Sequence, residues 1–199
     1  EMSGALNTNR SAKDFFFPQT ENLVDFKVEG KKIEVVDTRS ENEDFTLFGV
    51  RACDAASFGI LDKVFLSDPV DSYYKSRREH GTIVTLACSQ PEETCFCSAF
   101  GIDAAEPGGD ATAWMDEQTL YLRANTKKGE ALLKCAERLL LDAQDGEIAS
   151  SQDQTREIIK KLPIGDLCLD SFDPDKLLEI FNSDQWPQLS EACLGCGTC

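Results

Sequence analysis

The chain has 199 residues and a formal net charge of −16 at pH 7, from 20 Lys and Arg against 36 Asp and Glu. Such an acidic surface repels phosphate backbones, so nucleic acid is not an expected partner, and no apolar run approaches the ~20 residues that span a bilayer. With nine cysteines, a single histidine (His80) and no recognisable export signal, we expect a cytoplasmic protein whose cysteines are metal ligands or redox groups.

The first predicted elements describe an α/β fold. The triplet Phe15 to Phe17 before Pro18 indicates an extended segment pinned to a core, and residues 32–37 a short strand. The apolar runs 45–50 and 82–87 predict two buried strands, and between them 55–66 predicts a helix that Asp54 caps. Strand, helix and strand in this order favour two neighbouring parallel strands.

The second half of the chain adds a loop, a strand and several helices. A loop at 107–110 precedes a strand at 119–123 and an amphipathic helix at 126–142, in which Cys135 reads as a core thiol, as does Cys168 further on. Ser151 with Gln154 predicts a capping box that opens a helix ended by Pro163. Asp173 and Pro174 cap a helix at 176–181, and 182–187 reads as a linker. We therefore expect a domain with a mixed or parallel sheet at 1–182 and the start of a second module at 183–199.

Two cysteines directly follow the two buried strands. Cys53 comes after the first strand and Cys88 after the second, and ligands of such sheets lie beyond the carboxyl ends of the strands. Cys95-Phe96-Cys97 follows within nine residues of Cys88. Four soft ligands at one rim could hold a 4Fe–4S cluster or a tetrahedral zinc ion, or Cys53 and Cys88 could be ordinary buried thiols.

The last seven residues contain a second cysteine group, Cys193-x2-Cys196-x2-Cys199. This spacing is typical of bacterial-type ferredoxins, whose C-x2-C-x2-C-x3-C-P run wraps three corners of a 4Fe–4S cube. Gly195 and Gly197 suit the sharp turns of such a loop. A zinc knuckle or a flexible tail is the alternative. The fourth ligand would lie past Cys199, so we expect the chain to be a piece of a longer protein.

Several ordered motifs carry a family resemblance from about Lys13 to Cys199. They are Lys13 to Phe17 with Glu21 to Leu23, Phe48 to Asp54, Ile60 to Asp62, Tyr73 to Glu79, Cys88 with Pro91, Cys95 to Cys97, Thr126 to Gly129 and Cys193 to Cys199. With them the chain resembles the beta (iron–sulfur) subunit of cytoplasmic sulfhydrogenases and related soluble nickel–iron hydrogenases. The A subunit of anaerobic sulfite reductase is a close cousin of that family.

This resemblance implies an iron–sulfur electron-transfer subunit. In the family, an N-terminal α/β region precedes a dicluster ferredoxin module, and Cys53, Cys88, Cys95 and Cys97 would carry an additional 4Fe–4S cluster. Cys193, Cys196 and Cys199 would hold another, with a ligand outside the chain. Single electrons would pass between a subunit that binds flavin and nucleotide and a catalytic subunit of hydrogenase or sulfite reductase type. The chain lacks the usual phosphate-binding glycine motifs, so we expect no flavin or nucleotide on it alone.

Charged residues near these motifs have two interpretations each. Arg51 and Asp54 flank Cys53 and could tune a cluster, or simply pair with neighbours. Arg77, Arg78 and His80 could dock an acidic partner, or form a solvated helix face. Two other function classes stay open beside electron relay: an interaction module stabilised by zinc, and a redox enzyme in which a cluster binds substrate.

Overall fold

The computed structural model describes residues 10–41, 43–116, 119–144, 146–164, 167, 169 and 173–195. The chain divides into two units, residues 1–166 and 167–199. The predictions for Cys168, Cys196 and Cys199 lie outside the described residues. In the described part of the chain, none of the helices combines the length and the apolar character that crossing a membrane requires.

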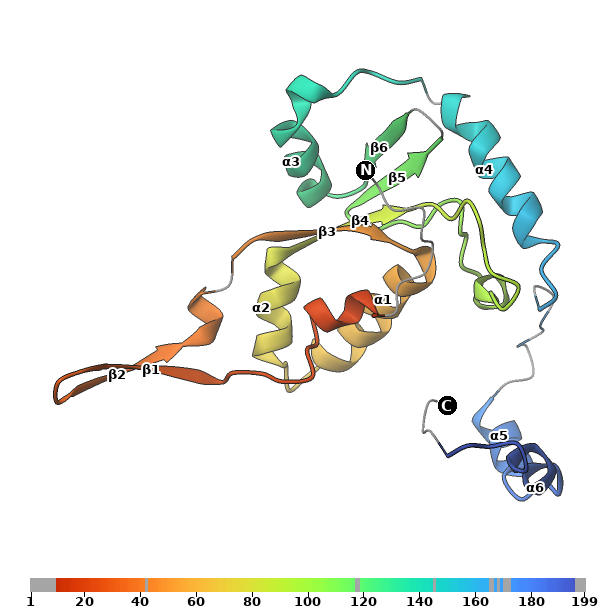
Figure 1. Cartoon of the computed structure of the whole chain (residues 1–199), viewed down its shortest axis with the longest axis horizontal. Coiled ribbons are helices and arrows are strands. Elements are labelled where there is room, and N and C mark those ends of the chain that lie inside the picture. Colours follow the sequence, from red (N-terminus) through yellow and green to blue (C-terminus); the bar gives the residue numbers. More distant parts are fainter. Residues whose placement is uncertain are drawn as a thin grey trace. The chain divides into compact units, whose positions relative to one another are not determined.

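A four-stranded mixed sheet organises the first unit (Figure 1). Its strands are β3 (Phe45–Val50), β4 (Gly81–Leu86), β5 (Ala111–Met115) and β6 (Leu120–Ala124), in that order across the sheet. The pairs β3–β4 and β4–β5 are parallel, and β5–β6 is antiparallel. The predicted α/β fold with neighbouring parallel strands is therefore confirmed. Strand β5 was not predicted, because a short run of alanine and threonine carries little periodic signal.

A bulge near the end of β3 decides which way the chain leaves that strand. Phe48 pairs with Val84, whereas Val50 pairs with Thr85, so Gly49 is an extra residue on the β3 side. Gly49 has φ of 87°, in the left-handed region that a residue without Cβ adopts at little cost. Because of this insertion Val50 joins the same core as Leu47, although an odd number of positions separates them along the strand.

Helices cover both faces of the sheet. On one face, α1 (Ala52–Phe65), α2 (Ser72–His80) and the short 3-10 helix η1 (Ala12–Phe15) enclose a core that includes Phe16, Phe58 and Ile83. On the other face, Val84 packs with residues of β5 and β6 and with Leu132 of α3 (Lys127–Cys135). Ile83 and Val84 are successive residues of β4 and point to opposite faces, so the unit has two cores around one sheet.

Two predictions about the N-terminal part are corrected by the structure. Phe16 is completely buried, which confirms that the aromatic triplet is pinned to the core, but η1 is helical and not extended. Helix α1 begins at Ala52 with Arg51 as its N-cap residue, three positions before the predicted start. Asp54 therefore lies inside the first turn and does not cap it. Its carboxylate accepts a hydrogen bond from the Ser11 hydroxyl at 3.3 Å.

The helices in the second half are placed differently from the prediction. Helix α3 ends at Cys135 and is followed by the 3-10 helix η4 (Glu137–Leu139), so the predicted helix to residue 142 is too long. Cys135 is exposed and is not a core thiol. Helix α4 (Gly146–Ile159) runs through the supposed capping box, because Ser151 can sit inside a helix as well as at its start. Its packing face contains Thr155 and Ile159.

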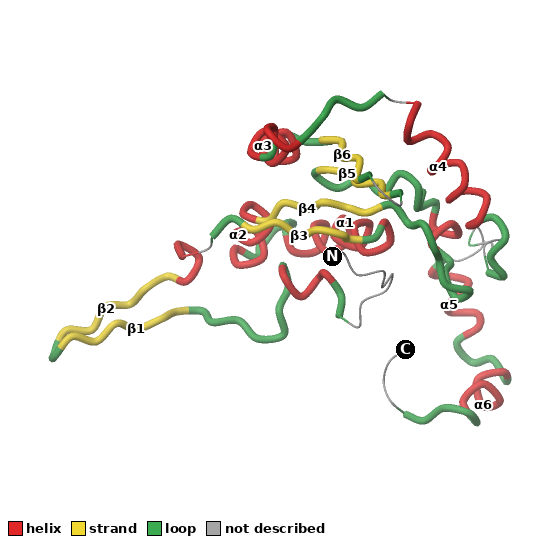
Figure 2. Tube along the Cα trace, turned by 45° about the horizontal axis from the view of Figure 1, so that its top comes forward, coloured by secondary structure: helices red, strands yellow, loops and turns green. Residues whose placement is uncertain are grey.

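A separate hairpin belongs to the first unit. Strands β1 (Val24–Glu29) and β2 (Lys32–Asp37) pair antiparallel and are followed by the 3-10 helix η2 (Thr38–Glu41). The hairpin makes no ladder with the four-stranded sheet and extends away from it (Figures 1 and 2). The sequence predicted β2 as a strand but did not predict β1.

Two short helices make up the described part of the second unit. They are α5 (Pro174–Ile180) and α6 (Gln185–Ser190). The Asp173 carboxylate accepts from the Lys176 amide at 2.7 Å, and Pro174 lies in the first turn, so the predicted cap is confirmed. Helix α6 covers residues 185–187 of the predicted linker at 182–187, so half of that segment is helical.

Candidate metal centre

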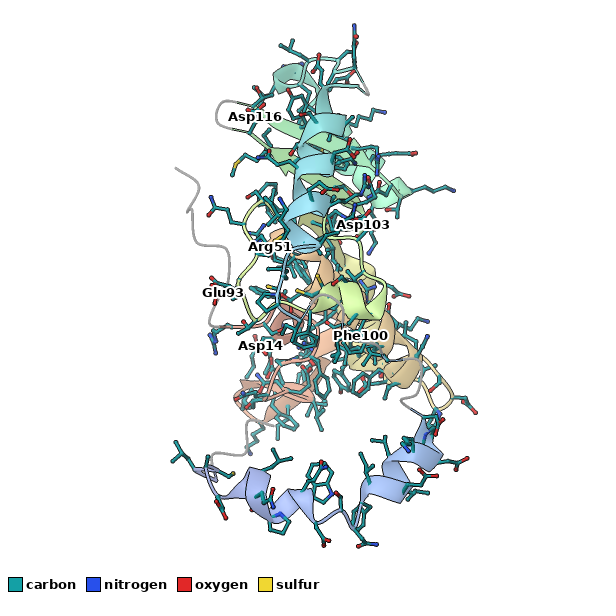
Figure 3. The ribbon with its side chains drawn as sticks, turned by 90° about the vertical axis from the view of Figure 1, so that its right-hand side faces the viewer. Asp14, Arg51, Glu93, Phe100, Asp103 and Asp116 are labelled. Atoms are coloured by element: carbon teal, nitrogen blue, oxygen red, sulfur yellow. The ribbon has the colours of Figure 1, made fainter. Side chains whose placement is uncertain are left out.

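The first two predicted ligands reach the same rim of the sheet. Cys53 is the second residue of α1 and follows β3 after two residues, and Cys88 follows β4 after one. Because β3 and β4 are parallel neighbours, their carboxyl ends lie side by side, as expected from the sequence. Figure 3 looks onto this side of the unit, with Arg51, Glu93 and Phe100 labelled.

The loop after Cys88 returns the other two cysteines to this rim. The Cys88 amide donates to the Ala104 carbonyl at 2.9 Å, which ties the two ends of the loop together. Cys95 closes a turn in which its amide donates to the Glu92 carbonyl, also at 2.9 Å. Cys97 opens the 3-10 helix η3 (Cys97–Phe100). Hydrogen bonds of the backbone therefore shape a segment that has little apolar content of its own.

The four thiols form one electrostatic group. Burial is the largest cause that raises the pKa of Cys53, Cys88 and Cys97, and the charges of neighbouring cysteines raise these pKa values further. Cys95 acts on all three, Cys53 acts on Cys88, and Cys53 and Cys88 both act on Cys97. Cys53 is exposed, and the other three are half-buried. The structure thus brings all four predicted residues together.

Backbone amides act on the sulfurs of this group. The Glu92 amide donates to the Cys95 sulfur at 3.3 Å. The backbone amides of Asp54, Gln90 and Ser98 act to lower the pKa values of Cys53, Cys88 and Cys97, against the larger effect of burial. Such N–H···S bonds stabilise thiolates and are one of the levers that set the potential of iron–sulfur clusters.

Arg51 and Asp54 place opposite charges beside this group. The Arg51 guanidinium donates to the Ala87 carbonyl at 3.3 Å and so links the ends of β3 and β4. Its positive charge acts to lower the pKa of Cys88, after the larger and opposite effect of burial. The negative charge of Asp54 raises the pKa of Cys53, again after burial.

The donor set suits a soft metal, but the thiols do not form a closed coordination shell. Four thiols match iron–sulfur clusters and zinc by ligand type. In the part of the chain that the structure describes, no group of three or more His, Cys, Asp and Glu side chains could hold a metal ion as it stands. Metal binding at this rim therefore requires the cysteines to move closer together.

A cavity adjoining the thiols is a feature that the sequence did not predict. Its volume is about 1050 Å³, and it lies between η1 and the end of β3, with Phe15, Phe48, Arg51, Cys53 and Asp54 among its lining residues. Both phenylalanines are exposed. No local pattern links η1 to Cys53, because only the tertiary contact between α1 and η1 brings them together.

The second cysteine group is described only at its first member. Cys193 lies in the second unit and is exposed. Its sulfur accepts a hydrogen bond from the Gly195 amide at 3.4 Å, and Gly195 has φ of 66°. The sharp turn expected at Gly195 is present, and an amide points at sulfur, as a ferredoxin-type loop requires.

The basic residues of α2 are engaged by carboxylates of the same unit. Arg77 pairs with Glu21, Arg78 with Asp62 at 2.8 Å, and the His80 ring lies 2.7 Å from Asp44. The arginine side chains are each 22% exposed. Because these ion pairs engage the two arginines and bury most of each side chain, the residues are not a simple solvated helix face; docking of an acidic partner here stays a prediction.

Comparison with known proteins finds a curated relative at high significance. The chain is 30% identical over 191 residues to Sulfhydrogenase 2 subunit beta of Pyrococcus furiosus, and the match covers 94% of this chain and 54% of that protein. The resemblance to sulfhydrogenase beta subunits is therefore confirmed, and the chain spans about half the length of this relative. No family model matches the chain, and no solved structure matches it.

Proposed function

We propose that this chain is an iron–sulfur electron-transfer part of a soluble, multi-subunit redox complex. Cys53, Cys88, Cys95 and Cys97 would hold one 4Fe–4S cluster, and Cys193, Cys196 and Cys199 would supply three ligands of another. When bound, such a cluster accepts and releases one electron at a time. The fourth ligand of the second cluster would come from outside the chain.

The observation that carries this proposal is the convergence of four thiols from three separate segments. The charges of the other cysteines act on Cys53, Cys88 and Cys97, and the Cys95 sulfur accepts a hydrogen bond from the Glu92 amide at 3.3 Å. Structural thiols do not need either property, because a buried cysteine behaves as a small apolar side chain. Similarity to a sulfhydrogenase beta subunit supports the same assignment.

The residues around the thiols would set the potential and the route of the electron. Arg51 favours the more negative, reduced state of a centre next to Cys88, and Asp54 disfavours it next to Cys53. Cys53 is the exposed thiol among the four and lines the cavity with Phe15 and Phe48, so a redox partner would approach the cluster from this side. We propose that the two partners are a subunit that binds flavin and nucleotide and a catalytic subunit of hydrogenase or sulfite reductase type.

Metal and sulfide content of the anaerobically purified chain tests this function. We expect iron and acid-labile sulfide in equal amounts, with a broad brown absorption that dithionite bleaches. A colourless chain with stoichiometric zinc would favour the alternative, an interaction module that uses the metal for folding. A chain that binds neither metal after reconstitution would refute both assignments.

Serine variants test the ligands one by one. Replacing Cys53, Cys88, Cys95 or Cys97 by serine is expected to remove or convert the first cluster, seen as loss of iron and a changed EPR signal. Cys135→Ser is the matched control, because that thiol is also exposed but lies in α3, away from the rim. If one of the four variants kept its full cluster, that cysteine would not be a ligand.

A further inference from the structure

The β1–β2 hairpin separates apolar from charged side chains with unusual clarity. Its register puts Phe26 opposite Val35 and Val28 opposite Ile33 on one face, with Val24 at the base. The other face carries Lys27 opposite Glu34 and Glu29 opposite Lys32. Residues directly opposite in an antiparallel pair point to the same side, so one face is apolar and the other carries pairs of opposite charge.

The apolar face is uncovered within the first unit. Val24, Phe26, Val28, Ile33 and Val35 are all exposed, Phe26 at 63% and Ile33 at 65%. Every residue of the two strands is exposed except Val36, which is half-buried on the charged face. An isolated hairpin is at best marginally stable in water, and a contiguous apolar patch of this kind marks an interaction site.

The base of the hairpin is firmly attached to α2, so the arm is presented in a defined direction. Three side-chain interactions join the segments next to the hairpin to α2: the Tyr73 hydroxyl donates to the Leu23 carbonyl at 2.7 Å, Arg39 donates to the Ser72 hydroxyl at 2.7 Å, and Arg77 pairs with Glu21. A fourth joins the two segments to each other, because the Thr38 hydroxyl donates to the Asn22 carbonyl at 2.8 Å. A loose loop would not need this anchoring.

We propose that the apolar face of the hairpin binds the same face of a second copy of this chain. In this dimer the two arms lie antiparallel, the tip of each over the base of the other, with Phe26 and Val35 near the two-fold axis. The inference is independent of the metal content of the cysteine site.

Charge favours this arrangement over contact between the bodies of two chains. The whole chain has a net charge of −16, whereas the two strands of the hairpin contain four acidic and two basic residues. Of these six, only Asp37 lies on the apolar face, at the base of the hairpin, where it pairs with Arg39. Six residues per strand make an arm of about 20 Å. Antiparallel arms keep the acidic bodies farther apart than the screening length of about 8 Å at physiological salt.

The exposed area indicates a weak dimer. Taking about 150 Å² for a whole side chain, the five apolar residues offer roughly 450 Å² per copy, close to the lower limit for a specific interface. We therefore expect a dissociation constant between about 1 µM and about 1 mM. Its dependence on salt should be small, whereas a dimer through the acidic bodies would strengthen markedly with salt.

Sedimentation velocity of the 199-residue chain tests the proposal. The measurement runs from about 1 µM to about 1 mM, anaerobically and with reductant, because Cys53, Cys135 and Cys193 are exposed and could form disulfides. We expect reversible dimerisation in wild type. A chain that stays monomeric over this range overturns the proposal.

A triple variant and a matched control locate the interface. Val28→Thr, Ile33→Thr and Val35→Thr keep β-branched side chains, so the hairpin stays formed while its face becomes polar. The dissociation constant should rise at least about a hundredfold, because apolar groups at three positions on each copy leave the interface. The control, Lys27→Thr with Glu34→Thr on the charged face, should dimerise like wild type. A dimer that survives in the triple variant uses another surface and overturns the proposal.

Discussion

Replacing Arg78 by alanine should destabilise the first unit substantially. Arg78 is central to a network between α1, α2 and the N-terminal segment. Its guanidinium donates to both carboxylate oxygens of Asp62 at 2.8 Å and lies over the rings of Phe16 and Phe58, at 5.1 and 5.7 Å from their centroids. Asp62 also accepts from the Tyr74 hydroxyl at 2.6 Å. Without Arg78 a half-buried carboxylate keeps only the tyrosine as a charge-stabilising donor.

The magnitude follows from these contacts. The bidentate charge-assisted pair contributes about 1–2 kcal/mol after allowance for the 22% and 28% exposure of its two side chains. The two cation–π contacts add about 0.5–1 kcal/mol each. We expect Arg78→Ala to lower the free energy of unfolding by about 2–4 kcal/mol in total.

Urea unfolding followed by circular dichroism measures this difference, with all variants in the same metal-loaded state. The control is Lys75→Ala on the same helix, whose pair with Glu79 spans 3.7 Å between side chains that are 55% and 64% exposed. It should change the free energy of unfolding by less than about 0.5 kcal/mol. An Arg78→Ala variant as stable as the Lys75→Ala variant would refute the reasoning.

Three further predictions concern charge and backbone. Hydrogen bonds from Arg78, and then from Tyr74, hold the pKa of Asp62 below its ordinary value, against the opposing effect of burial. The ionised Asp62 therefore stabilises the fold above about pH 4, and this stabilisation is lost as the pH falls through the lowered pKa of the folded state. In urea titrations, the stability advantage of wild type over Asp62→Asn should shrink towards pH 2–3. In the loaded chain, Arg51→Met should lower the reduction potential of the first cluster and Asp54→Asn should raise it, in anaerobic EPR redox titrations, and equal shifts of the same sign would contradict their proposed roles. Gly129→Ala should destabilise the first unit by more than about 2 kcal/mol, because the added Cβ would clash with the Asp110 carbonyl. Gly59→Ala should instead stabilise α1 by about 0.5–1 kcal/mol, because a Cβ at Gly59 meets no other atom. Thermal melts of the two variants and wild type test both expectations.

The positions of Cys53 and Cys88 could be predicted from the sequence, because each cysteine comes just after an apolar run that marks a strand. Runs of apolar residues marked β3 and β4, and the βαβ pattern made them parallel neighbours, so Cys53 and Cys88 had to reach one rim. Cys95 and Cys97 were assigned through spacing and resemblance. Helix boundaries were less predictable: Asp54 reads as a cap, yet Arg51 is the N-cap residue and α1 begins at Ala52.

The order of apolar strands and helix in the sequence was enough to place Cys53 and Cys88 at one rim, because each of these elements is encoded in a short local pattern. It was not enough for the surroundings of the thiols or for the exposed hairpin. The contact of η1 with α1 and the ion pairs that engage Arg77 and Arg78 join residues from 16 to 56 positions apart. Whether an apolar stripe such as that of β1 and β2 is buried or left for a partner depends on what packs against it, and a one-dimensional pattern of polarity is the same in both cases.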